Sequence, residues 1–311
     1  MLERRLARYD MNVMKMTVPR FALIPCLDRG VLRSGSLVAV ALLSALVLAC
    51  VPAAHATEGG PATAGKAADA PAGDAGQEAH GPEPVEFAAD DGVRVFADLY
   101  RGPRGKAGPV MLLFHQAGSN SAEYEPIAPR LVEMGYTCLA LDQRSGGRRW
   151  GRNNRTVMKN GPSTDFESAH ADLEAALAWV RRQGYGGPVI AVGSSYTAAL
   201  VFRLASESQG LAAIVAFSPG EYFGDGNPVR GWASKVTVPI YATSGEGKEV
   251  FVTRQIIDAS PSTAKSHYVP RVGVHGASTL RTDRNPQGAA ENWSAFEAFL
   301  SAHGQAQASA R

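Results

Sequence analysis

The stretch AVGSSYTAAL, residues 191–200, decides the fold because it places a glycine and two serines between an apolar run and a helix-forming segment. It fits the pattern G-x-S-x-T, with Gly193, Ser195 and Thr197 at the defined positions. A serine at the centre of such a pattern sits on a sharp turn from strand to helix that exposes its hydroxyl. The alternative is that Ser195 is an ordinary helix N-cap. Ser194, at the variable position, is the weaker candidate for a reactive hydroxyl.

The segments on either side of this turn alternate between apolar runs and helix-forming stretches. VEFAADDGVRVFADLY, residues 85–100, predicts a hairpin around Asp-Asp-Gly. Buried strands are predicted in PVMLLF, YTCLALD, GPVIAVGSS, LAAIVAFSP and VTVPIYATS, and another strand is predicted in HYVPRVGV. Helices are predicted over 121–134, over 196–206 and around Trp293, Phe296 and Leu300. A further helix is predicted to begin at a capping box formed by Thr164 and Glu167. Strands that alternate with helices pair in parallel. The sequence therefore predicts a three-layer α/β/α sandwich with a mostly parallel sheet of about eight strands.

Polar groups follow four of these predicted strands. Ser195 ends GPVIAVGSS, Glu246 and Glu249 follow VTVPIYATS, His275 follows HYVPRVGV, and the loop HQAGSN follows PVMLLF. In a parallel sheet, functional groups gather at the carboxyl ends of the strands. A hydroxyl, a carboxylate, an imidazole and a tight loop should therefore meet at one edge, in the chain order serine, acid, histidine.

This chain order, the initial hairpin and the turn at Ser195 resemble the α/β-hydrolase fold over residues 85–303. No long insertion separates the strands, so the chain looks most like the compact dienelactone-hydrolase-like members, which lack a large lid. The resemblance implies that Ser195 is the nucleophile, His275 the base and Glu249 the acid that orients the histidine, with Glu246 as the alternative acid. Either glutamate departs from the more usual aspartate.

The resemblance also implies two backbone N–H donors for the oxyanion that forms during acyl transfer. One belongs to Tyr196, after the nucleophile, and the other to Gln116 or Ala117. Gln116 stands where the family often has a glycine, and His115 before it is interpreted as a structural residue at a strand end rather than a base. Thr197 replaces the last glycine of the usual pattern, and we interpret it as a tolerated variation.

Two further segments border the predicted edge. QRSGGRRWGRNNRTVMKNGP, residues 143–162, carries six cations and no acid. Two interpretations are open: Arg144 and its neighbours hold an anionic or polar acyl group, or the segment is a solvated loop in which Arg144 pairs with Asp142. Tyr222 and Phe223 follow another strand end and are candidates to wall the acyl pocket.

The amino-terminal part of the chain does not resemble a folded domain. A basic leader, the apolar run SLVAVALLSALVLAC and the motif AHAT predict a secretory signal over residues 1–56, cleaved after Ala56. VLAC, ending at Cys50, resembles a lipobox, so lipidation there or an uncleaved membrane anchor are the alternatives. Residues 57–84 are rich in Ala, Gly and Pro and predict a flexible tether before the folded domain at 85–305.

Charge and composition exclude several classes of function. Without residues 1–56 the chain keeps 24 basic and 26 acidic residues, a net charge of −2. A nucleic-acid partner is therefore not expected, because binding a polyanion needs surplus Lys and Arg. Cys138 is the one cysteine outside the leader and is interpreted as a buried core residue, with no disulfide framework. No G-x-G-x-x-G, P-loop or H-E-x-x-H motif appears, so neither a cofactor nor a metal is predicted.

The resemblance implies an exported serine hydrolase, periplasmic or secreted, that cleaves a small carboxylic ester or thioester through an acyl-enzyme. Two alternatives are an amidase or peptidase with the same triad and a non-catalytic envelope binding protein that keeps the fold. The sequence leaves the natural substrate and the oligomeric state open.

Overall fold

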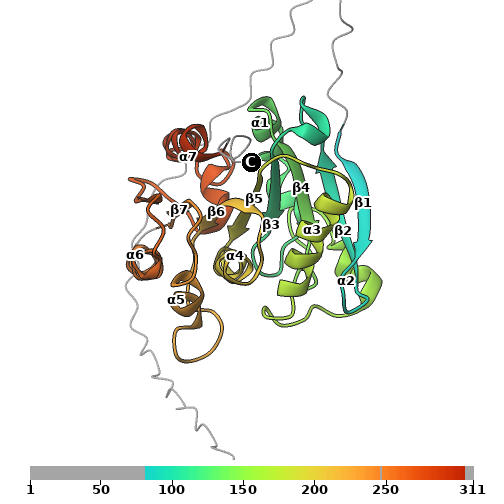
Figure 1. Ribbon diagram of the computed structural model, residues 1–311, viewed down its shortest axis with the longest axis horizontal. Helices are drawn as coiled ribbons and strands as arrows, with labels where there is room; N and C mark the ends of the chain where they lie inside the picture. The colour runs from blue at the N-terminus through green and yellow to red at the C-terminus, as the bar shows by residue number, and fades with distance from the viewer. Residues whose placement is uncertain (1–80, 246, 305–311) are drawn as a thin grey trace, which may run out of the picture. The chain divides into compact units, whose positions relative to one another are not determined.

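A computed structural model describes residues 81–245 and 247–304 (Figure 1). The predicted secretory signal, with its alternative sites at Ala56 and Cys50, lies outside the described residues. So do most of the predicted tether and the alternative acid Glu246.

The centre of the fold is an eight-stranded sheet in the order β1-β2-β4-β3-β5-β6-β7-β8. β1 and β2 form the predicted hairpin, β2 also pairs antiparallel with β4, and the other neighbouring pairs are parallel. The strands are β1 (Glu83–Ala88), β2 (Arg94–Tyr100), β3 (Val110–Phe114), β4 (Thr137–Asp142), β5 (Val189–Ser194), β6 (Leu211–Phe217), β7 (Ile240–Thr243) and β8 (Lys265–Tyr268). This confirms the predicted mostly parallel α/β architecture. β1 begins at Glu83, inside the segment expected to be tether.

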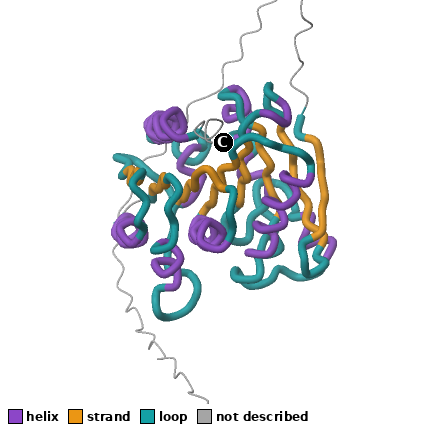
Figure 2. The backbone as a smooth tube through the Cα atoms, viewed as in Figure 1, coloured by secondary structure: helices purple, strands orange, loops and turns teal. Residues whose placement is uncertain are grey.

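The middle strands are covered on both faces, which is why they read as continuous apolar runs. Every residue of β3, β4 and β5 is buried. Neighbouring side chains point to opposite faces: Leu112 and Phe114 of β3 pack in one core, Met111 and Leu113 in the other. Figure 2 shows helices on both sides of the sheet.

The helices are divided between the two faces (Figure 1). α1 (Ala128–Glu133) and α7 (Ala289–His303) cover one face, and α3 (His170–Arg182), α4 (Tyr196–Glu207), α5 (Pro228–Ala233) and α6 (Lys248–Ala259) cover the other. α2 (Arg155–Asn160) lies beside β2, and 3-10 turns occupy η1 (Gly105–Ala107), η2 (Ser121–Tyr124) and η3 (Gly276–Leu280). Between β1 and α7, the described residues, which leave out position 246, contain no inserted lid domain. No helix in this described part is both long and apolar enough to cross a membrane.

Prolines make two predicted elements shorter than expected. The helix predicted over 121–134 is instead the turn η2 followed by the short helix α1, which has Pro129 in its first turn. Proline has no N–H to donate to the carbonyl four residues earlier, so Pro126 and Pro129 interrupt the hydrogen bonds of one continuous helix there. β8 ends at Tyr268, before Pro270, and a loop rather than a strand end therefore leads to His275.

The capping box predicted at Thr164 and Glu167 is wrong. α3 begins at His170, and the residue before it makes no side-chain capping hydrogen bond. The Thr164 hydroxyl donates to the Asp165 carbonyl instead, and the Asp165 carboxylate accepts from the Ser168 N–H at 2.8 Å. A local turn around Asp165 takes the place of the expected first helical turn.

Candidate active site

Ser195 lies at the tip of the turn between β5 and α4, with φ 62° and ψ −121°. Positive φ is strained for a residue with a side chain, and such strain is concentrated at functional sites. A Cβ added to Gly193 would lie 2.3 Å from the Thr197 carbonyl oxygen, so only glycine fits there. The Ser195 hydroxyl makes no capping hydrogen bond to α4, so the alternative of an ordinary N-cap is wrong.

Thr197 stabilises this turn from inside the protein. Its hydroxyl is fully buried, accepts from the Ser194 N–H at 2.8 Å and donates toward the Phe114 carbonyl at 2.8 Å. The position that is glycine in the usual pattern therefore carries a side chain that ties the turn to the end of β3. The small Thr197 side chain is fully buried at this position.

Ser195, His275 and Glu249 form a continuous line of hydrogen bonds. His275 Nε2 lies 2.8 Å from Ser195 Oγ, and His275 Nδ1 lies 2.7 Å from Glu249 Oε1. A carboxylate can only accept, so it fixes the proton on Nδ1 and leaves Nε2 free to accept the serine proton. The structure thus brings together three residues that are far apart in the chain, with Glu249 in the first turn of α6.

The Glu249 carboxylate is held by more than the imidazole. The His275 hydrogen bond, aided by the Ser218 hydroxyl and the Gly245 N–H, holds the pKa of Glu249 below its usual range, although partial burial opposes this. Ser218 also accepts a hydrogen bond from the Gly276 N–H at 3.0 Å, which ties the histidine loop to the end of β6. Sequence reasoning missed Ser218, although its place directly after a buried strand was a signal for this edge.

The backbone donors for an oxyanion are resolved by the contacts of the loop after β3. Gln116 N–H already donates to Glu123 Oε2 at 2.8 Å, so the prediction of Gln116 as an oxyanion donor is wrong. Within the described ranges, no hydrogen bond uses the N–H of Ala117. The N–H of Tyr196, the first residue of α4, has no partner inside its helix. Ala117 and Tyr196 are therefore the available pair.

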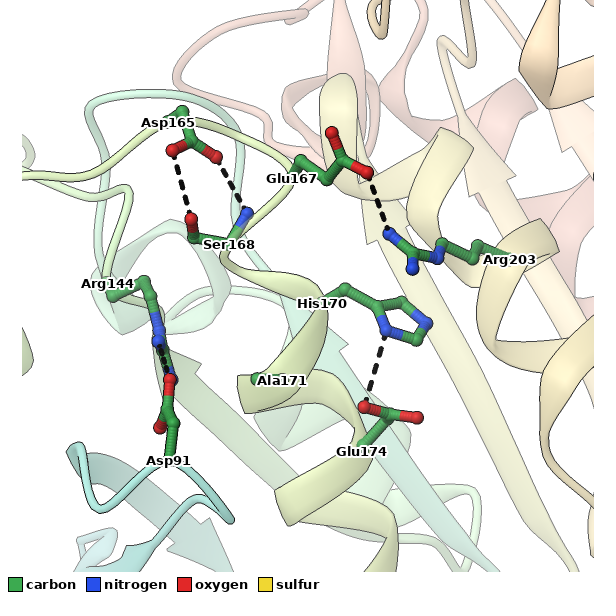
Figure 3. Close-up of a pocket in the computed structure, with 9 residues that line it drawn as sticks. All are labelled: Asp91, Arg144, Asp165, Glu167, Ser168, His170, Ala171, Glu174 and Arg203. Carbon is green, nitrogen blue, oxygen red and sulfur yellow. Dashed lines mark hydrogen bonds and ion pairs between the residues drawn. The ribbon is translucent and has the colours of Figure 1, made fainter. Parts of the chain in front are cut away.

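Arg144 is held in ion pairs and lines a pocket whose lining residues do not include Ser195. Its side chain is 7% exposed and pairs with Asp91 (Figure 3). It also pairs with Asp172, at 2.7 Å. The prediction that Arg144 binds substrate is therefore wrong, because its N–H groups face two carboxylates. The alternative pairing with Asp142 is also wrong, since Asp142 pairs with Arg155.

The other cations of residues 143–162 are partly neutralised as well. Arg152 and Arg155 each lie 2.9 Å from a carboxylate oxygen of buried Asp98. Arg149 is exposed, and its Nη1 donates to Gln116 Oε1 at 3.2 Å. This segment therefore places Arg149, rather than Arg144, next to the loop that carries the Ala117 N–H.

Tyr222 and Phe223 have different surroundings. The Tyr222 hydroxyl donates to the Ser218 carbonyl at 3.1 Å, and burial raises the pKa of Tyr222 against the effect of a hydrogen bond with the Ser195 side chain. Phe223 instead packs edge-on against Trp232 of α5, with ring centroids 5.3 Å apart. Of the two predicted pocket residues, Tyr222 is the one beside the Ser195 hydroxyl.

A pocket of 490 Å³ lies away from Ser195, near the start of α3 (Figure 3). In the described part of the chain, His170, Glu174 and Glu207 place potential metal ligands within 4.8 Å of one another. Arg203 Nε lies 3.1 Å from Glu207 Oε1 and supplies a cation to the same carboxylate cluster. The cluster is therefore at least partly neutralised by the protein itself.

Comparison with models of known protein families identifies the family of this chain. The family model described as serine aminopeptidase, S33, matches residues 105–268. The chain belongs to this family. It is an α/β-hydrolase, as the resemblance implied, and the matched residues contain Ser195 and Glu249 but end before His275. A comparison with curated proteins finds no match.

Solved structures of similar fold include enzymes of two kinds. The esterase Pf2001 of Pyrococcus furiosus is 18% identical with a TM-score of 0.56, over 71% of this chain and 92% of that chain. Est1E of Butyrivibrio proteoclasticus, solved with ferulic acid bound, is 14% identical with a TM-score of 0.54, over 70% of this chain and 98% of that chain. An acylaminoacyl peptidase of Pyrococcus horikoshii is 12% identical with a TM-score of 0.54, over 74% of this chain and 43% of that chain. These likenesses establish the fold, and the dienelactone-hydrolase-like subgroup stays a prediction.

Proposed function

We propose that this S33-family protein is a serine hydrolase that cleaves carboxylic esters or thioesters through an acyl-enzyme. The observation that carries the proposal is the pair of hydrogen bonds from Ser195 Oγ to His275 Nε2, 2.8 Å, and from His275 Nδ1 to Glu249 Oε1, 2.7 Å. A serine hydroxyl becomes a useful nucleophile only beside an oriented base, and this geometry provides one.

In the proposed reaction, Ser195 Oγ attacks the carbonyl carbon while His275 Nε2 takes its proton. Charge moves to the carbonyl oxygen, which the N–H groups of Ala117 and Tyr196 would stabilise. The imidazolium, stabilised by Glu249, then gives its proton to the leaving alcohol or thiol as the tetrahedral carbon collapses to the acyl-enzyme. Water repeats these steps with the same proton transfers and releases the acid.

The decisive experiment combines a fluorophosphonate probe with peptide mapping. We expect the probe to label Ser195, and Ser195→Ala to lose both labelling and turnover, with kcat falling on the order of a million-fold. Ser206→Ala, a hydroxyl removal on the same helix whose side chain bonds the Arg203 carbonyl, is the matched control. Folded wild-type protein that the probe does not label would overturn the proposal.

A second candidate is cleavage of an amide or peptide bond. The family description and the acylaminoacyl peptidase of similar fold favour it, and the same three residues would serve. The two reactions differ in the leaving group, so kcat/KM for matched p-nitrophenyl esters and p-nitroanilides of the same acyl group separates them. Saturable ligand binding without turnover of any activated ester would instead favour the non-catalytic binding protein.

We further propose that the protein is exported, because the basic leader, apolar run and AHAT motif of residues 1–56 fit a secretory signal. A mass measurement of the mature amino terminus tests this. Cleavage after Ala56 supports a soluble exported form, a lipid mass on Cys50 supports a lipoprotein, and an intact start in the cytoplasmic fraction contradicts export.

A further inference from the structure

Glu123 is a fully buried acid that the catalytic line does not use. It lies in η2, has 0% of its surface exposed and accepts three hydrogen bonds. Gln116 N–H donates to Oε2 at 2.8 Å, Gln116 Nε2 donates to Oε1 at 3.1 Å, and Ser194 Oγ donates to Oε1 at 2.7 Å. One carboxylate thus joins the loop after β3 to the turn that carries Ser195.

Ser194 extends this network to the histidine loop. Its hydroxyl, which donates to Glu123, accepts a hydrogen bond from the Ala277 N–H at 2.9 Å. The approach is close, since a Cβ on Gly276 would lie 2.5 Å from Ser194 Oγ. The loops that carry the Ala117 N–H, Ser195 and His275 therefore meet on a single side-chain pair beneath the site.

The groups around the Glu123 carboxyl are hydrogen-bond donors. Each side-chain or backbone group bonded to it is a donor, and the Gln116 amide is oriented by Arg149, which donates to its oxygen. Burial raises the pKa of Glu123, and these donors together with Arg149 oppose that rise. A buried polar group is costly unless its hydrogen bonds are made, so loss of any donor should move the loops.

We propose that Glu123 is a positioning residue of the hydrolase, which holds the oxyanion loop, the nucleophile turn and the histidine loop in one fixed arrangement. It turns the Gln116 N–H inward and so leaves the Ala117 N–H as the donor for the substrate. The inference rests on the proposed function, because it concerns the geometry of that same reaction.

Three variants test this role. Glu123→Gln keeps the volume but places an NH₂ group against a donor, so at least one loop contact is lost; we expect kcat to fall roughly 100-fold. Ser194→Ala keeps Glu123 and Gln116 but removes the link to Ala277, and we expect kcat to fall roughly tenfold. Glu125→Gln, on the same segment but paired with surface Arg152, is the control and should keep the wild-type kcat.

The readout is kcat divided by the number of active sites, which the fluorophosphonate probe counts in a parallel sample. KM is measured in the same kinetic experiment. Positioning predicts one labelled site per folded chain, lower kcat per labelled site and little change in KM. A purely structural role predicts fewer labelled sites with wild-type kcat at each, and this result would overturn the inference. Wild-type protein unlabelled at Ser195 would overturn the proposed function itself. If Glu123→Gln does not fold, Ser194→Ala decides, and wild-type kcat per labelled site in that variant contradicts the role.

Discussion

His115 should make the protein lose stability in acid. It is fully buried at the end of β3, where Nδ1 donates to the Gln116 carbonyl at 2.7 Å. Nε2 accepts from the Gln143 N–H at 3.0 Å and lies 3.2 Å from Asn154 Nδ2. A proton on Nε2 would point at two donors, so the folded protein holds the neutral imidazole. This agrees with the interpretation of His115 as a structural residue rather than a base.

The magnitude follows from the shift of its pKa. Burial lowers the pKa of His115 from 6.5 to about 4, although the Gln116 carbonyl and nearby Asp142 favour the proton. The unfolded chain binds this proton below pH 6.5 and the folded protein does not, so stability falls as pH falls from 6.5 toward 4. At 1.36 kcal/mol for each pH unit of difference, the loss is roughly 3 kcal/mol.

The assay compares urea unfolding of the wild type and His115→Gln at several pH values and constant ionic strength. Glutamine stays neutral and can present an oxygen near the position of Nε2. The variant should be less stable at pH 7, because the bond to the Gln116 carbonyl is lost, yet its free energy of unfolding should fall by roughly 3 kcal/mol less between pH 7 and pH 4. The carboxylates titrate in both proteins, so their contributions to the pH dependence of stability cancel in the difference. Parallel loss of stability in the two proteins would refute the reasoning.

Three further substitutions have defined outcomes. Glu249→Gln should lower kcat roughly 10⁴-fold with little change in KM, because an amide cannot stabilise the imidazolium. Steady-state kinetics measure this, and a loss of kcat below tenfold would contradict it. Gly193→Ala should prevent folding or strongly lower the melting temperature, because the new methyl group would lie 2.3 Å from the Thr197 carbonyl oxygen. A thermal unfolding transition at the wild-type temperature would contradict this prediction. Arg144→Met should destabilise the fold by about 3–5 kcal/mol in urea unfolding, because buried Asp172 loses its cation. The same variant should keep KM within about twofold in any fraction that folds, because the N–H groups of Arg144 already face Asp91 and Asp172. A large selective rise in KM would restore the substrate role.

Most of the fold could be predicted from the sequence because buried parallel strands have a strong local pattern. The apolar runs at 110–114, 137–142 and 189–194 are strands in the structure almost as predicted. The errors occur where local chemistry competes with periodicity. Pro129 shortened one predicted helix, and the Asp165 turn replaced a predicted first helical turn.

The approximate position of the site could also be predicted, because strand ends in a parallel sheet share an edge. This placed Ser195, Glu249 and His275 near one another, and the structure brings them within hydrogen-bonding distance. Their catalytic roles stay predictions. The sequence could not show that Arg144 is taken up by ion pairs, since its partners Asp91 and Asp172 are far from it in the chain.

The departure from glycine at Gln116 shows why backbone donors cannot be assigned from a motif alone. From the sequence alone, replacing the glycine by Gln116 restricts only the backbone conformations of the loop. In the structure, its N–H and its amide both donate to Glu123, and its carbonyl oxygen Oε1 accepts from Arg149. A glycine would keep the first of these bonds and lose the other two, leaving the buried carboxylate with fewer donors and without its link to a cation. Gln116 and Glu123 are therefore best understood as one structural unit, in which the buried carboxyl group of Glu123 fixes the direction of the Gln116 N–H.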